Sequence, residues 1–195
     1  MNNSEAETAI LVVDDEESLR STFQLFLQNE GYSPVITAST YEEALAELND
    51  RHFDLIISDI VLGGSTGIDL LRRVRELGRT CPVVMITGYP TVETASEAVR
   101  LGAFDYIPKP VEKQTLLKTA RLALRQHQLE QGQRRAEQER ERYRTFLETV
   151  FKSVADGIVT VDPDLAVMEM NPAARLLFGS LDPGLLEQGS LLGLC

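Results

Sequence analysis

The sequence predicts an α/β fold in which five parallel strands form a doubly wound sheet with helices on both faces. Short aliphatic runs alternate with amphipathic helical stretches five times between residues 9 and about 128. Such alternation requires crossover connections, which favour a parallel sheet. Glycines follow several helical stretches, where helices commonly end. Polar residues follow the aliphatic runs directly, as at the edge of a parallel sheet where binding sites form.

The strands are assigned from their aliphatic and β-branched composition, which is typical of strands buried on both faces. They are expected at Ala9–Val13, Pro34–Thr37, Asp54–Ser58, Pro82–Thr87 and Phe104–Ile107. The helices are assigned from apolar residues spaced three and four apart. They are expected over residues 17–30, 41–50, 67–77 and 91–101, and a fifth begins near Glu112.

The first strand ends in a run of acidic residues, "ILVVDDEES". Adjacent carboxylates repel one another unless a positive group offsets them. One interpretation is that Asp14 or Asp15 caps the following helix, whose dipole favours the two glutamates. The other is a binding site, because Asp59, Thr87 and Lys109 follow the third, fourth and fifth strands. The carboxyl ends of parallel strands meet at one edge of the sheet, so the topology favours the binding site.

These side chains together suit phosphoryl chemistry. Converging carboxylates bind a hard cation such as Mg²⁺, which takes oxygen ligands. A lysine ammonium and a threonine hydroxyl can each contact a phosphoryl oxygen. A carboxylate beside the cation can act as a nucleophile and form an aspartyl phosphate, while the cation and the lysine offset charge on the transferred group. The acidic run therefore predicts half of a metal–phosphoryl pocket, with Mg²⁺ as the cofactor.

Four motifs, "ILVVDDEES", "FDLIISDIVL", "VVMITGY" and "AFDYIPKP", are similar in order and spacing to those of the receiver domain of bacterial two-component response regulators. The resemblance covers residues 9 to about 125 and implies a flavodoxin-like sheet with strand order 2-1-3-4-5. It also implies that a partner histidine kinase donates a phosphoryl group. The expected function is therefore a phosphorylation-dependent switch in a two-component phosphorelay.

The resemblance implies a role for each residue that matches a motif. Asp59 would accept the phosphoryl group, and Asp14, Asp15 and Asp59 would hold Mg²⁺. The remaining implied features are the carbonyl of Val61 as a metal ligand, Thr87 as the switch hydroxyl, Lys109 as the phosphoryl-binding lysine, Tyr106 as an aromatic side chain that turns inward on activation, and a cis peptide bond between Lys109 and Pro110. One position departs from the family: receivers commonly carry proline four residues after the phosphoacceptor, where this chain has Gly63.

Two other functions stay open. A Mg²⁺-dependent phosphohydrolase of the haloacid-dehalogenase type also uses an aspartate nucleophile, but it requires a second acid two residues later, where this chain has Val61. The other possibility is a receiver that binds partners and is never phosphorylated. The complete set of site residues argues against this second possibility.

Residues 112–154 are rich in Gln, Glu, Arg and Leu and predict a long helix that overlaps the last receiver helix. Its apolar stripe is clear over Leu116–Leu129, lapses over Gln131–Arg142 and resumes at Tyr143. One interpretation is a short parallel coiled coil, with a homodimer formed through this helix or through the receiver. The other is a solvated helix without a partner, because no heptad seam persists for the roughly three or four repeats that a coiled coil needs.

Residues 155–195 predict the start of a second domain. Strands at Gly157–Val161 and Ala166–Met170 are expected on either side of a turn, and Asn171 and Pro172 open a helix that runs to Phe178. The segment "FLETVFKSVADGIVTVDPDLAVMEMNPAARLLFG" resembles the opening of a PAS sensory domain, of which only an incomplete part is expected here. A generic strand-turn-strand-helix fragment is the alternative.

The output of the switch is expected to lie in a longer regulator. The sequence contains no helix-turn-helix, no P-loop and no kinase catalytic motif. The stretch "TGYPTVETASEAVRLGAFDYIPKP" resembles the receivers of ATPase-type transcription activators. A hybrid histidine kinase is the alternative.

Composition narrows the remaining classes of protein. A net charge of −11 on 195 residues opposes a surface that binds nucleic acid. No apolar run approaches the roughly 20 residues of a membrane helix, and the polar residues 1–8 are expected to be disordered rather than a signal peptide. Cys81 and Cys195 form no metal-ligand spacing, and His52 and His127 are expected at the surface. These features predict a reduced, cytoplasmic setting without membrane contact.

Overall fold

The structure, a computed structural model, describes residues 8–164 and 167–178. The chain divides into two compact units, Met1–Gln131 and Gly132–Cys195. The disorder expected for residues 1–8 falls, apart from Thr8, outside the described residues.

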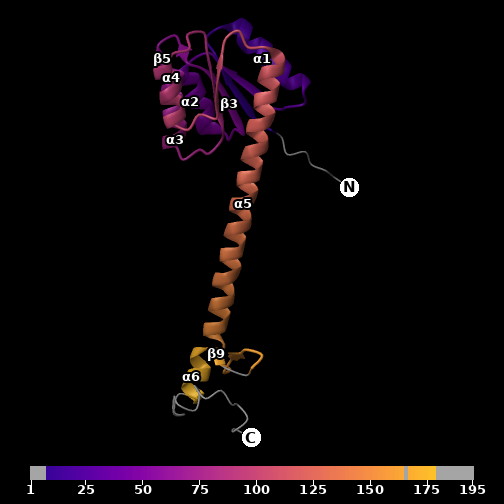
Figure 1. Cartoon of the computed structure of the whole chain (residues 1–195), viewed down its shortest axis with the longest axis vertical. Coiled ribbons are helices and arrows are strands. Elements are labelled where there is room, and N and C mark those ends of the chain that lie inside the picture. Colours follow the sequence, from indigo (N-terminus) through magenta and orange to yellow (C-terminus); the bar gives the residue numbers. More distant parts are fainter. Residues whose placement is uncertain (1–7, 165–166, 179–195) are drawn as a thin grey trace. The chain divides into compact units, whose positions relative to one another are not determined.

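The first unit contains a five-stranded parallel sheet (Figure 1). Its strands are β1 (Ile10–Val13), β2 (Val35–Ala38), β3 (Leu55–Asp59), β6 (Val83–Thr87) and β7 (Asp105–Pro108). They lie in the order β2-β1-β3-β6-β7, which is the predicted order 2-1-3-4-5 when the strands of this sheet alone are counted. The predicted doubly wound α/β fold is therefore confirmed, and its strands differ from the expected ones only at their ends.

Five helices connect and follow these strands: α1 (Glu17–Asn29), α2 (Tyr41–Asp50), α3 (Gly67–Glu76), α4 (Val92–Arg100) and α5 (Lys113–Ser153). Threonine side chains fix the starts of three of them. Thr40, Thr66 and Thr91 precede α2, α3 and α4, and each accepts a hydrogen bond from the backbone N–H three residues on. This bond satisfies one of the amide groups that a helix start leaves without a partner.

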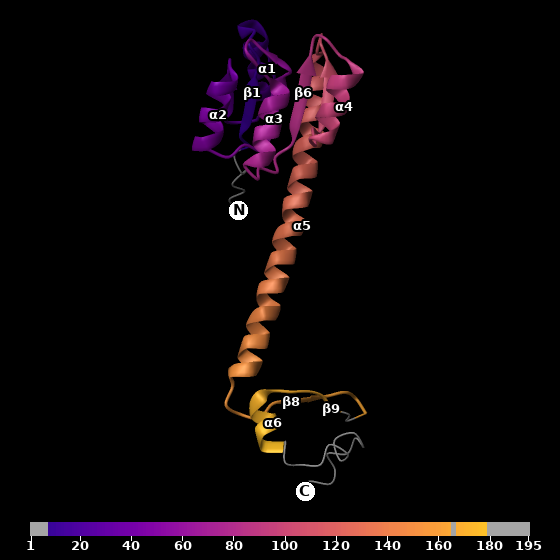
Figure 2. The same cartoon turned by 90° about the vertical axis from the view of Figure 1, so that its left-hand side faces the viewer.

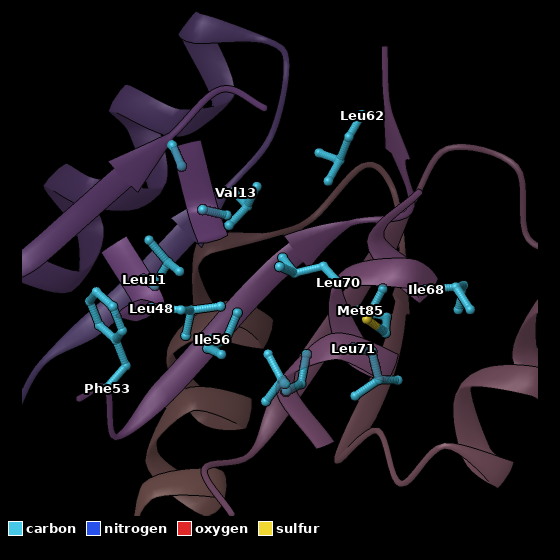
Figure 3. Close-up of a cluster of buried hydrophobic side chains, with 14 of the residues drawn as sticks. Leu11, Val13, Leu48, Phe53, Ile56, Leu62, Ile68, Leu70, Leu71 and Met85 are labelled. Atoms are coloured by element: carbon cyan, nitrogen blue, oxygen red, sulfur yellow. The ribbon is translucent and has the colours of Figure 1, made fainter. Parts of the chain in front are cut away.

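The core of this unit consists of two apolar clusters, one on each face of the sheet. On one face, Leu11, Ile56 and Met85 of the sheet pack with Leu48 of α2 and Leu71 of α3 (Figure 3). On the other face, alternate strand residues pack with α1 and α5. Burial on both faces explains why the strands are continuous aliphatic runs without alternating polar residues.

A short hairpin that the sequence did not predict follows β3. Its strands, β4 (Val61–Leu62) and β5 (Ser65–Thr66), pair antiparallel. Gly63 in the connection has φ +65°, a backbone conformation that proline cannot adopt because its ring fixes φ near −65°. The departure from the family at this position therefore matches the local backbone.

The second unit contains the C-terminal part of α5 and a small α+β segment. α5 is one helix of 41 residues and extends from Lys113 to Ser153 (Figure 2). After it, β8 (Val159–Val161) and β9 (Val167–Met170) pair antiparallel, and α6 (Pro172–Phe178) follows. Among the described residues, no helix combines the length and apolarity needed to cross a membrane.

The two histidines differ in burial. His52 is exposed, as expected, but His127 is only 6% exposed, so its expected surface position is wrong. His127 lies one turn beyond Ala123 and Leu124, which are buried against the sheet. Residues three and four apart share a helix face, so His127 continues the buried stripe of α5.

Candidate functional site

Three carboxylates converge at the carboxyl edge of the sheet. Asp14 follows β1 and Asp59 ends β3, and these strands are neighbours in which Val13 pairs with Ser58. Asp15 follows directly on Asp14. One oxygen from each of the three carboxylates lies within 4.8 Å of the other two. Asp14 and Asp59 are buried, whereas Asp15 is exposed. The parallel topology thus brings together the aspartates that the sequence analysis selected.

Lys109 provides the positive charge at this cluster. It directly follows β7, and its backbone N–H donates to the carbonyl of Thr87 at 2.7 Å. Its Nζ lies 2.8 Å from Oδ2 of Asp14 and 2.7 Å from Oδ2 of Asp59. The Lys109–Pro110 peptide bond is cis. A single ammonium therefore bridges two carboxylates from different strands.

Burial and charge act in opposite directions on these groups. Burial raises the pKa of Asp14 above its ordinary value, although the hydrogen bond from Lys109 counteracts it. Burial acts to lower the pKa of Lys109, but the hydrogen bonds to Asp14 and Asp59 and the negative charges of these residues together outweigh burial and leave this pKa above its ordinary value. Lys109 consequently stays positively charged at neutral pH and offsets the repulsion between the carboxylates.

The backbone fixes the second oxygen of both buried aspartates. Oδ1 of Asp14 accepts a hydrogen bond from the N–H of Glu16 at 2.9 Å, and Oδ1 of Asp59 accepts one from the N–H of Val61 at 3.3 Å. α1 begins after Glu16, whose side chain makes no capping hydrogen bond. Asp14 and Asp15 therefore are not the N-cap of α1, and the capping interpretation of the acidic run is wrong.

The backbone after Asp59 passes very close to the start of α3. A Cβ atom on Gly67 would lie 2.0 Å from the carbonyl oxygen of Asp59. The N–H of Gly67 also donates to the carbonyl of Ile60 at 2.8 Å. Only glycine fits at this position without displacing the backbone that carries Asp59.

The cluster suits a small hard cation. Asp14, Asp15 and Asp59 supply only oxygen donors, which is the ligand type that Mg²⁺ prefers. Val61 is half exposed and follows Asp59 by two residues. Its backbone lies beside the cluster because its N–H bonds to Asp59, and the ligand role of its carbonyl stays a prediction.

Thr87 and Tyr106 occupy neighbouring strands but have different partners. Thr87 ends β6, is buried, and accepts a hydrogen bond at Oγ1 from the N–H of Tyr89 at 3.1 Å. Tyr106 in β7 is half-buried, and its hydroxyl lies 2.8 Å from Oγ1 of Thr94 in α4. The sequence analysis did not select Thr94, because a threonine near a helix start carries no signal of a distant partner.

Arg20 is a second residue near the site that the sequence analysis did not select. It lies in α1, and its Nη1 donates to the backbone carbonyl of Asp14 at 2.6 Å. Sequence spacing gives no indication of this contact, because the path between β1 and α1 determines whether the side chain can reach the carbonyl.

Comparisons with known families match both units. The model of the response regulator receiver domain matches residues 10–121, and the model of a PAS domain matches residues 141–193. The chain is 40% identical over 126 residues to the alginate biosynthesis transcriptional regulatory protein AlgB of Pseudomonas aeruginosa, a match that covers 65% of this chain and 28% of AlgB. It is 38% identical over 115 residues to the transcriptional regulatory protein ZraR of Escherichia coli O157:H7, covering 59% of this chain and 26% of ZraR. The matched region thus spans only about a quarter of these relatives.

Solved structures are similar to the first unit. A CheY-like receiver domain protein from Methanospirillum hungatei superimposes with a TM-score of 0.62 at 32% identity, covering 64% of this chain and 99% of that one. The beryllofluoride-activated NtrC4 receiver domain dimer gives a TM-score of 0.58 at 32% identity, and the match covers 61% of this chain and 98% of the NtrC4 chain. NtrX from Brucella abortus in complex with ADP gives a TM-score of 0.60 at 40% identity, and the match covers 64% of this chain and 28% of the NtrX chain.

Proposed function

Since residues 10–121 place this chain in the family of response regulator receiver domains, we propose that it is a phosphorylation-dependent switch whose phosphoacceptor is Asp59. The observation that carries the proposal is the position of Lys109, whose Nζ bridges Asp14 and Asp59 at 2.8 and 2.7 Å. This arrangement places a nucleophilic carboxylate beside a fixed positive charge, as transfer of an anionic group requires.

In the proposed reaction, an oxygen of Asp59 attacks the phosphorus of a phosphohistidine on a histidine kinase. The P–N bond breaks as the new P–O bond forms, and the histidine nitrogen leaves with the electron pair. Lys109 then exchanges part of its contact with Asp59 for a phosphoryl oxygen and neutralises its charge. Burial of Asp59 limits the access of water to the acyl phosphate.

The carboxylates of Asp14, Asp15 and Asp59 would hold Mg²⁺ together with the carbonyl of Val61. A bound Mg²⁺ would supply further positive charge for the phosphoryl oxygens. In the described part of the chain, Lys109 forms ion pairs with Asp14 and Asp59, and its single charge does not balance three carboxylates. We therefore expect the phosphorylation rate to depend on Mg²⁺.

The switch would act through Thr87 and Tyr106. The Thr87 hydroxyl would turn from the N–H of Tyr89 toward the phosphoryl group, and Tyr106 would leave Thr94 and turn inward. These changes would alter the surface formed by α4 and β7 and shift the populations of two conformations. We propose that α5 transmits the shift to the PAS segment as a change in helix pairing within a homodimer. The dimeric state of the similar NtrC4 receiver domain supports this proposal.

The whole protein would be a regulator longer than this sequence, in which the PAS segment precedes an output module. Because AlgB and ZraR are transcriptional regulatory proteins, an ATPase-type transcription activator is the favoured output, and a hybrid histidine kinase is the alternative. A phosphohydrolase is disfavoured, because Val61 occupies the position of the second acid and cannot exchange a proton.

The proposal is tested by intact-mass measurement after incubation with acetyl phosphate and Mg²⁺. We expect wild type to gain one phosphoryl group only with Mg²⁺, and Asp59→Asn to gain none. Asp50→Asn, at an exposed position in α2, is the matched control and should be phosphorylated like wild type. Size-exclusion chromatography of the same samples tests for dimerisation. Modification of Asp59→Asn, or a failure of wild type to form even a beryllofluoride adduct, would contradict the proposed role of Asp59.

A further inference from the structure

Arg20 contacts the acidic cluster at the peptide bond between Asp14 and Asp15, two of the three clustered aspartates. Nη1 of Arg20 donates to the carbonyl oxygen of Asp14 at 2.6 Å. This carbonyl belongs to the planar peptide between Asp14 and Asp15. Because the peptide is planar, fixing its oxygen also fixes the direction in which the Cα of Asp15 lies.

Every other polar atom of Asp14 also has a partner. Its N–H donates to the carbonyl of Ala38 at 3.2 Å, and its two carboxylate oxygens accept from the N–H of Glu16 and from Nζ of Lys109. Asp15 differs, since its side chain is exposed although one of its oxygens belongs to the cluster. The backbone carbonyl of Asp14 is the polar group of this residue that adjoins Asp15 in the chain, and it accepts its hydrogen bond from Arg20.

We propose that Arg20 is a positioning residue for the divalent cation, which orients the Asp14–Asp15 peptide so that the Asp15 carboxylate faces the cation site. The inference rests on the proposed function, since it concerns the Mg²⁺ that this function requires. Arg20 acts through the two aspartates and does not itself contact the cation.

The positioning role of Arg20 and the effect of its charge change the affinity for Mg²⁺ in opposite directions, so an experiment can tell them apart. A guanidinium near a divalent cation repels it, so removing the charge alone would tighten Mg²⁺ binding. Loss of the hydrogen bond would free the Asp14–Asp15 peptide and weaken binding. If Arg20 is a positioning residue, the loss of its hydrogen bond must weaken Mg²⁺ binding by more than the loss of its charge strengthens it.

Glu43 in α2 reduces the electrostatic effect. Hydrogen bonds from Ser39, and to a smaller extent the charge of Arg20, lower the pKa of Glu43. Glu43 is therefore ionised at neutral pH and offsets part of the positive charge of Arg20. This offset reduces the repulsion between Arg20 and a bound cation.

The test is isothermal titration of the whole chain with Mg²⁺, without a phosphodonor. We expect Arg20→Gln to weaken Mg²⁺ binding by about tenfold, within the range measured for partners that orient metal ligands. Arg20→Lys, which keeps the charge and one donor, should bind with an intermediate Kd. Arg73→Gln is the matched control, because it removes the same charge from an exposed ion pair with Glu76, and it should leave the Kd within about twofold of wild type.

A kinetic readout separates positioning from general loss of structure. With acetyl phosphate, Arg20→Gln should raise the Mg²⁺ concentration at half-maximal rate, while the rate at saturating Mg²⁺ stays near that of wild type. If Arg20→Gln fails to fold, Arg20→Met, which keeps an aliphatic stem, replaces it with the same expected results.

Two outcomes overturn different statements. If Arg20→Gln binds Mg²⁺ as tightly as wild type or more tightly, Arg20 acts only as a charge and the positioning role is wrong. If wild type itself binds no Mg²⁺ and takes up no phosphoryl group, the proposed function fails, and the inference fails with it.

Discussion

The two units of the chain are stabilised in different ways. In the first, apolar clusters cover both faces of a five-stranded sheet. In the second, among the described residues of β8, β9 and α6, only Ala174 is a buried apolar residue, and Leu176 and Leu177 are 85% and 68% exposed. A two-stranded hairpin is only marginally stable in water. We therefore expect most of the stability of the chain to reside in the first unit.

Hydrogen bonds supplement the small apolar burial in the second unit, and the side chain of Asn171 makes several of them. Asn171 is fully buried. Its Oδ1 accepts from the N–H groups of Ile158 and Ala174 at 2.9 and 2.8 Å, and its Nδ2 donates to the carbonyl of Asp156 at 2.9 Å. One side chain thus joins the segment between α5 and β8 to the first turn of α6. A segment that buries few apolar side chains can therefore still adopt a defined fold when one buried polar side chain has all its hydrogen bonds satisfied.

The largest expected effect tests the apolar half of this comparison. Leu71 is fully buried in α3, and Leu71→Ala should reduce the free energy of unfolding of the first unit by about 2–5 kcal/mol, because it removes apolar contacts and leaves a cavity. The matched variant is Leu176→Ala in α6, which should change stability by less than about 0.5 kcal/mol. Urea unfolding monitored by circular dichroism measures both. Equal effects would contradict the comparison.

The next effect tests the polar half. Asn171→Ala leaves the N–H groups of Ile158 and Ala174 without their partner, at a cost of about 1–3 kcal/mol. Amide hydrogen exchange should accelerate in α6 and at the start of β8, while β1 and β3 exchange as in wild type. Replacing exposed Asn49 in α2 by alanine is the control. Unchanged protection in α6 would show that Asn171 does not hold this unit together.

A smaller effect depends on pH and concerns the first unit only. Burial raises the pKa of the Cys81 thiol from 9.0 to about 11. Below pH 9 the thiol is protonated in both states; above pH 9 it ionises in the unfolded state first, so folding stability falls as pH rises toward 11. The expected loss is about 1.4 kcal/mol at pH 10. It is measured as the difference between the pH profiles of wild type and Cys81→Ala, and parallel profiles would refute it.

The smallest effect concerns the contact between Tyr106 and Thr94. Tyr106→Phe removes a single hydrogen bond of 2.8 Å between half-exposed hydroxyls, and should cost about 1 kcal/mol or less of stability. The same variant should bind beryllofluoride more tightly, because the aromatic ring no longer has to leave Thr94. A cycle with Thr94→Val and the double variant isolates the pair. Strictly additive effects of the two substitutions would mean that the contact does not restrain Tyr106.

The sequence predicted the fold and the convergence of the candidate site residues, because both depend on periodic patterns and chain order. Aliphatic runs such as Leu55–Ile57 are typical of strands buried on both faces, and the structure places this run in β3. Once the sheet is parallel, residues that follow its strands must meet at one edge, so Asp14, Asp59 and Lys109 could be brought together without coordinates. The buried position of His127 was missed, because a polar residue within the helix carries no sign of whether it faces the core or the solvent.

What the sequence by itself determined is the alternation of strands and helices, and the acidic and basic residues placed at the strand ends. The tertiary structure alone decided the contacts of Arg20 with Asp14 and of Thr94 with Tyr106, and the space that permits only glycine at position 67. The physical reason is range. Periodicity and topology act through every residue of an element, whereas a hydrogen bond or a close approach depends on a distance of a few ångströms between two groups, which no local pattern encodes.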